Sequence, residues 1–160
     1  MSRDVRDLAL KRVFTILGTL GFVTTWRNRA DIEPLNPETK QPQLPAAVLL
    51  DWKENRRVST RGKALGTQFP PTLMDLTPEI WVVLMPKENQ TNEEIDQEIT
   101  TWRRNIVVAI RDDDSLIALL GNSGEIEYLG METDMQSGGP MEGSIRFDFS
   151  FSYMFDPDDL

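Results

Sequence analysis

One stretch near the C-terminus alternates between apolar and polar side chains more regularly than any other part of the chain. Its apolar residues are Ile145, Phe147, Phe149, Phe151, Tyr153 and Phe155, separated by Arg146, Asp148, Ser150, Ser152 and Met154. Side chains of a β-strand point alternately to its two faces, so this pattern predicts one long strand with an aromatic face and a polar face. We expect the aromatic row to be buried core. The alternative is an edge strand that also serves as an interface.

Two segments repeat apolar residues with the period of an α-helix. In residues 3–20 the apolar stripe consists of Val5, Leu8, Ala9, Val13, Ile16, Leu17 and Leu20. A second helix is expected from about residue 92 to residue 111, because Thr91 and Glu94 form a capping-box pattern ahead of the next stripe. That stripe consists of Ile95, Ile99, Trp102, Ile106, Ala109 and Ile110.

The acidic run Asp112-Asp113-Asp114 follows the second helix. Its carboxylates could bind Mg²⁺ or Ca²⁺, but the run lacks the alternating spacing and the distal Glu of a calcium loop. Aspartate is a preferred N-cap residue, so we expect the run to cap a short helix over residues 115–120.

The remaining strands and loops complete a recognisable order of elements. Apolar, β-branched or aromatic runs predict strands at residues 22–26, 46–52, 80–85 and 125–131. Prolines, glycines and charges predict long loops at about residues 27–45, 53–78 and 132–143. One helix, three strands, two helices and two strands indicate an α+β fold. We expect a single domain over residues 1–160, with a mixed or antiparallel sheet of about four to five strands and two main helices packed on one face.

The composition excludes several kinds of chemistry. The chain has no cysteine and no histidine, which rules out a disulfide scaffold, a thiolate or imidazole metal site and a Ser-His-Asp triad. We expect no cofactor. The charged N-terminus predicts no signal peptide, and apolar runs of about six residues are too short to cross a membrane. The expectation is a soluble protein made in the cytosol.

Charge is distributed unevenly along the chain. Residues 1–70 contain 12 basic and 7 acidic side chains, whereas residues 71–160 contain 5 basic and 19 acidic ones, for a net charge of −9. A protein that wraps nucleic acid is normally basic, so tight DNA binding is not expected. Either the acidic surface serves solubility, or the basic side of one copy meets the acidic side of the next, which favours head-to-tail rings.

Asp51-Trp52-Lys53 at the end of an apolar run suggests one enzymatic alternative. In metal-dependent nucleases a carboxylate binds Mg²⁺ and a lysine two residues later positions the attacking water. A further acidic ligand is needed upstream, and Asp31 lies in the right range. The structural alternative is a strand that ends at the surface in a charged turn.

Basic side chains cluster in the two loops that flank the second expected strand. They are Arg27, Arg29, Arg56, Arg57, Arg61 and Lys63. No glycine-rich phosphate cradle accompanies them, so a solvated loop and a contact with a partner or a neighbouring ring subunit are the main alternatives.

Taken in order, these pieces resemble the tail terminator (tail completion) proteins of long-tailed bacteriophages. The resemblance covers most of the chain and rests on the order of elements around short motifs, which are Trp26-Arg27-Asn28-Arg29, Leu44-Pro45-Ala46-Ala47-Val48-Leu49-Leu50-Asp51, Pro78-Glu79-Ile80-Trp81-Val82-Val83, Leu119-Leu120-Gly121 and the closing aromatic strand with Tyr153.

The resemblance implies a non-enzymatic virion protein. Such a protein would form a hexameric ring on the head-proximal end of the tail tube, stop tube growth and join the tail to the head-tail connector or stopper protein. DNA would pass through the lumen without specific binding. The protein would be assembled in the host cytoplasm and reside in the neck region of the virion. The alternatives are the nuclease with Asp31, Asp51 and Lys53, or another ring component of the neck or tube.

Overall fold

The computed structural model describes residues 4–29, 32, 34–57, 71–85, 88–134 and 143–156. The elements follow the expected order of one helix, three strands, two helices and two strands. They are α1 (Val5–Gly18), β1 (Thr24–Arg27), β2 (Ala46–Arg56), β3 (Thr72–Val83), α2 (Asn92–Arg111), α3 (Asp114–Leu120), β4 (Glu125–Asp134) and β5 (Ser144–Phe155). The α+β prediction is confirmed.

The strands form one five-stranded sheet in the order β1-β2-β3-β5-β4. β1 pairs with β2 in parallel, and the other three pairs are antiparallel, so the sheet is mixed. β5, the aromatic strand, is inserted between β3 and β4. The last strand of the chain is therefore internal to the sheet, and β1 and β4 are its two edges.

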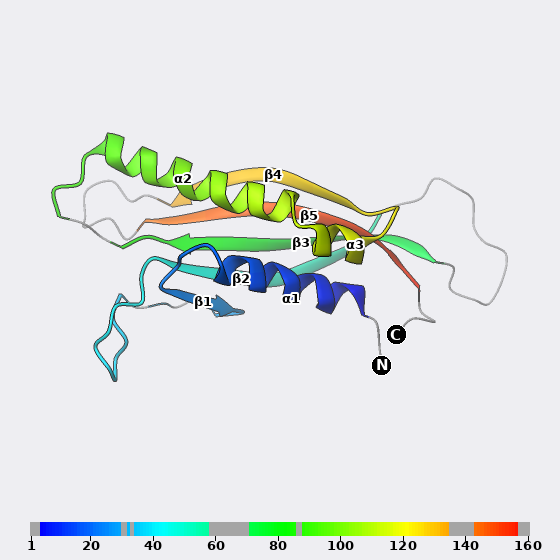
Figure 1. Cartoon of the computed structure of the whole chain (residues 1–160), viewed down its shortest axis with the longest axis horizontal. Helices are drawn as coiled ribbons and strands as arrows, with labels where there is room; N and C mark the ends of the chain where they lie inside the picture. The colour runs from blue at the N-terminus through cyan, green and yellow to red at the C-terminus, as the bar shows by residue number, and fades with distance from the viewer. Residues whose placement is uncertain are drawn as a thin grey trace.

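The helices lie on one face of the sheet, and the core lies between these two layers (Figure 1). Phe147, Phe149, Phe151 and Tyr153 are all at most 2% exposed, which confirms them as core, and Phe155 packs against them partly buried. Phe149 and Phe151 stack with ring centroids 6.0 Å apart. The apolar stripes of α1 and α2 cover this row, as their 3.6-residue periods predict.

The second face of β5 is more buried than its polar sequence predicts. Ser150 is 9% exposed and Ser152 is 1% exposed. Because β5 has a neighbour on both sides, its serines lie between the side chains of β3 and β4. The backbone N–H of Glu125 donates to Ser152 Oγ at 2.8 Å.

The predicted loop over residues 53–78 is wrong at both ends. β2 continues to Arg56 and β3 begins at Thr72; residues 58–70 lie outside the described part. Pro78, the last residue of the predicted loop, lies inside β3. The pairing of β2 with β3 shifts between Leu50 and Lys53, directly opposite Pro78. This bulge accommodates a residue that has no N–H to donate to the ladder.

Smaller corrections apply to other boundaries. The strand expected at residues 125–131 extends to Asp134, so the loop expected from residue 132 begins later. The short strand after α1 is Thr24–Arg27, which shortens the loop expected at residues 27–45. The capping box of α2 is confirmed, since Thr91 Oγ accepts from the Glu94 N–H and the Glu94 carboxylate accepts from the Thr91 N–H.

Candidate functional site

The sheet face opposite the helices carries most of the charge on the strands. Leu76, Ile80 and Phe147 are buried on the helix side, and alternate residues of the same strands point the other way. By the strand register, the acidic residues on this open face include Asp75, Glu79, Glu125, Glu127, Glu132 and Asp148. No described helix covers them, so the open face is a candidate contact surface.

Two arginines neutralise part of this acidic face. Arg146 pairs with Glu132 at 2.8 Å and with Asp148 at 3.2 Å. Arg57 reaches Asp75 with two hydrogen bonds of 2.8 and 3.1 Å, and this carboxylate raises the pKa of Arg57 further. Acidic side chains outnumber these two cations, so the open face keeps a negative balance among the described residues.

Asp51 lies at the centre of an ion-pair network that joins α1 to the sheet. Its carboxylate accepts from Arg27 Nη2 at 3.1 Å and lies 3.7 Å from Arg6 Nη2, while its backbone carbonyl accepts from Arg6 at 3.1 Å. Asn28 Oδ1 accepts from the Asp51 N–H at 3.2 Å. Only 11% of the Asp51 side chain is exposed. Through its bonds to Arg6 and Arg27, Asp51 thus connects both helix α1 and strand β1 to β2.

Glu54 extends the network toward β5. It accepts a hydrogen bond from the hydroxyl of Tyr153 and lies 3.8 Å from Arg6. Burial raises the pKa of Glu54, and the charge of Arg6 opposes this shift. The pair Glu54–Tyr153 therefore links β2 to the last strand beneath the N-terminal turn of α1.

The nuclease residues do not form a shared site. Asp51 is directed toward α1, whereas Lys53 lies opposite Thr77, on the open face. Asp31 lies outside the described residues. Within the described part of the chain, no three acidic or other metal-ligating side chains gather to hold a metal ion. The positions of Asp51 and Lys53 on opposite sides of the sheet argue against the nuclease alternative.

The predicted basic contact residues have different surroundings. Arg27 is held by Asp51 and lies 3.7 Å from Asp7 of α1, and Arg57 pairs within the open face. Arg29 lies over the Trp26 ring at 4.5 Å. Arg56 is exposed at the end of β2. Arg61 and Lys63 lie outside the described residues.

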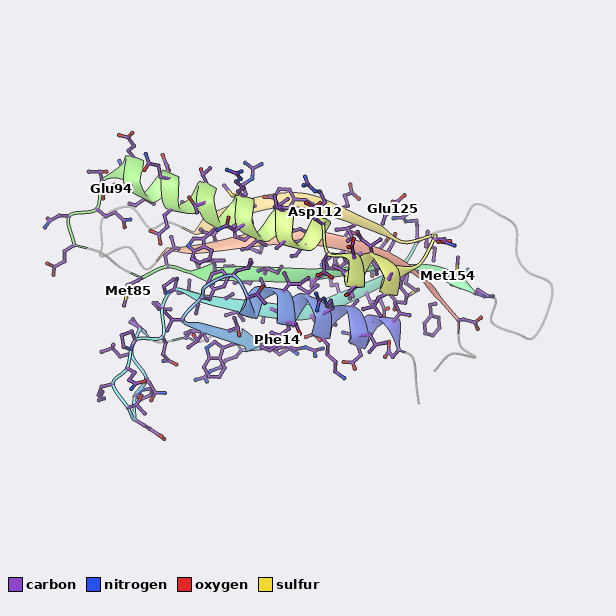
Figure 2. The ribbon with its side chains drawn as sticks, viewed as in Figure 1. Phe14, Met85, Glu94, Asp112, Glu125 and Met154 are labelled. Carbon is purple, nitrogen blue, oxygen red and sulfur yellow. The ribbon has the colours of Figure 1, made fainter. Side chains whose placement is uncertain are left out.

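The acidic run after α2 connects α2 to α3 and contacts α1 (Figure 2 labels Asp112 at the end of α2). Asp113 caps α3 by accepting from the Leu116 N–H at 2.7 Å, and it accepts two hydrogen bonds from Arg12 of α1, at 2.6 and 3.0 Å. The Arg12 bond lowers the pKa of Asp113. Asp112 pairs with its neighbour Arg111 instead. The capping prediction is confirmed.

Sequence reasoning missed the Asp51 and Asp113 ion pairs, because their partners are distant along the chain.

None of the described helices is long and apolar enough to cross a membrane. A comparison with protein-family models found no match to this chain, and a comparison with curated proteins found none either.

Proposed function

We propose that this chain is a structural virion protein that assembles into a hexameric ring on the head-proximal end of a long-tailed phage's tail tube. Bound there, the ring stops tube growth and presents a surface to the head-tail connector or stopper protein. The protein is then a component of the virion neck, assembled in the host cytoplasm.

The observation that carries this proposal is the uneven charge of the strands across the sheet. β1 and β2 contain three basic and two acidic side chains, whereas β3, β5 and β4 contain one basic and seven acidic ones. Opposite charge at the two ends of one sheet favours contact between different surfaces of identical copies, the arrangement that generates rings.

The acidic open face fits the same role. Carboxylates repel DNA phosphates, so a lumen lined with them lets DNA pass without gripping it. Contacts with the tube or a neighbour would involve the segments expected from the sequence to be loops, at about residues 53–78 and 132–143, of which residues 58–70 and 135–142 lie outside the described part. Another ring component of the neck or tube would share these properties.

The experiment that tests the proposal measures the mass of the purified protein by light scattering across concentration and images the heaviest species by negative-stain electron microscopy. We expect closed rings with a central hole. Added to the polymerising tube protein of the same phage, the protein should shorten the tubes.

A chain that itself polymerises into long tubes would instead be a tube component. Mg²⁺-dependent cleavage of DNA that is lost in Asp51→Asn and in Lys53→Ala would overturn the structural role and support the nuclease.

A further inference from the structure

The sheet has two open edges of different length. β4 pairs only with β5, so the ten residues Glu125–Asp134 have no described strand on their other side. β1 ends at Arg27, opposite Leu49, so β2 beyond Leu50 also has an outer edge without a described strand. On β2 the N–H and C=O of Asp51 are already bonded to Asn28 and Arg6. The edge of β4, and that of β2 after Asp51, have no described strand beside them and can pair with another chain.

The β4 edge lacks the lysines and prolines that most often prevent such pairing. It contains no lysine, no arginine and no proline, and its exposed apolar side chains include Leu129, 53% exposed, and Met131, 41% exposed. Its bulge at Tyr128–Gly130 bends the strand only locally. Burial of these two side chains against a partner would remove apolar surface from water.

The side chains of the two edges are opposite in charge and lie on the same face. Glu125 and Glu127 are opposite Ser152 and Ser150 of β5, which places both on the open face. Lys53 of β2, opposite Thr77, is on that face too, whereas Arg56 is opposite Met74, which packs against the core, and so points to the helix side. In the described part of the chain, Lys53 forms no ion pair, and Glu125 has one weak pair, 3.9 Å from Arg57 of its own chain.

This distribution selects one way of joining two copies. Two β4 edges brought together would face glutamate against glutamate, which is unfavourable for directly opposed strands. A β4 edge beside a β2 edge would bring Glu125 and Glu127 near Lys53, with the open faces of both copies continuous.

We propose that the exposed β4 edge of one copy docks along the outer edge of β2, residues 52–56, in a second copy. The glutamates of the first copy meet Lys53 of the second. The contact uses two different surfaces and is therefore repeatable from copy to copy, closing into a ring when the rotation between neighbours permits. This inference rests on the self-assembly in the proposed function and names its interface.

The test uses paired charge reversals in the full chain. Variant A carries Glu125→Lys with Glu127→Lys, and variant B carries Lys53→Glu. Each alone presents like charges at the contact, so we expect its self-association to weaken by about 100-fold and its mass to approach 18.3 kDa. An equimolar mixture should recover the wild-type mass, because A and B then alternate with complementary edges.

Controls separate the interface from general charge effects. Glu88→Lys with Asp96→Lys changes the net charge as much as variant A does, but on exposed residues before and within α2, and should leave the mass unchanged. Circular dichroism and thermal melting show that each variant is folded. Hydrogen exchange of the β4 amides should show protection that depends on protein concentration.

Several outcomes overturn the inference, and they differ from failure of the proposed function. Rings that persist in A and B would refute this interface but leave the ring proposal standing. A mixture of A and B that stays at 18.3 kDa while the wild type associates would do the same. A wild type that remains a single chain with its β4 amides fully protected would show that the chain covers its own edge, and would refute both.

Discussion

Replacing Asp51 separates a structural role from a catalytic one. As a metal ligand, Asp51 would be dispensable for folding, because ligand carboxylates repel one another when no metal is bound. In the structure it instead compensates Arg27 and Arg6, whose side chains are 27% and 31% exposed. We therefore expect Asp51→Ala to destabilise the fold.

The size of the effect follows from the contacts. A hydrogen bond to a charged group contributes about 1.5–3 kcal/mol, and partial exposure of both arginines reduces this through solvent screening. Removal also leaves Arg27 without its nearest anion, and Arg27 Nε has no partner among the described residues. We expect a loss of about 2 kcal/mol, equivalent to a fall of about 4–8 °C in Tm for a chain of this length.

The assay is urea denaturation followed by tryptophan fluorescence, with thermal melting as a second measurement. Lys53→Ala is the matched control, because Lys53 belongs to the same sequence motif but is exposed on the open face; its effect should stay within about 0.5 kcal/mol. Asp51→Asn keeps one acceptor and should cost less than Asp51→Ala.

Equal stability of Asp51→Ala and the wild type would refute the reasoning. Loss of a Mg²⁺-dependent cleavage activity in both Asp51→Ala and Lys53→Ala, with unchanged unfolding midpoints, would point to the nuclease instead.

Three further changes test other parts of the fold. Asp113→Ala removes an N-cap and the Arg12 pair and should cost about 2 kcal/mol at pH 7, whereas the neighbouring Asp112→Ala, on the surface, should cost much less. Because the folded pKa of Asp113 is lowered, its contribution should decrease as the pH falls below about 4, and a stability difference that does not shrink with acidification would contradict this. Burial raises the pKa of Glu54, so its ionised form is penalised in the folded state, and Glu54→Gln should be as stable as the wild type or more stable at pH 7, with the difference vanishing below about pH 4 in acid titrations of unfolding. Phe149→Ala should cost about 3–5 kcal/mol by urea denaturation, whereas Met154→Ala on the same strand, 43% exposed, should cost far less; similar losses for both would contradict the burial assignment.

The element order could be predicted from the sequence because each signal is local. The capping box at Thr91 and the period of Ile95, Ile99 and Ile106 lie within a few turns of one helix, and they locate α2 with no knowledge of the rest of the chain. The aromatic alternation of β5 likewise indicates its buried face.

Strand ends were harder to predict because local signals conflicted. Pro78 indicates a break, but the tertiary pairing places the β2 bulge opposite it and keeps β3 continuous to Val83. Only the partner strand shows that a proline can be accommodated there. The same holds for Ser150 and Ser152, whose burial depends on neighbours on both sides of β5.

Local patterns in the sequence locate the helices and the aromatic strand and show that basic and acidic residues occupy different halves of the chain. The fold places the strands of these halves toward opposite ends of one sheet and brings Asp51 to Arg27 and Arg6, which are 24 and 45 residues away. The physical reason is that periodicity and capping act between residues a few positions apart, whereas an ion pair depends on which distant segments the core brings together.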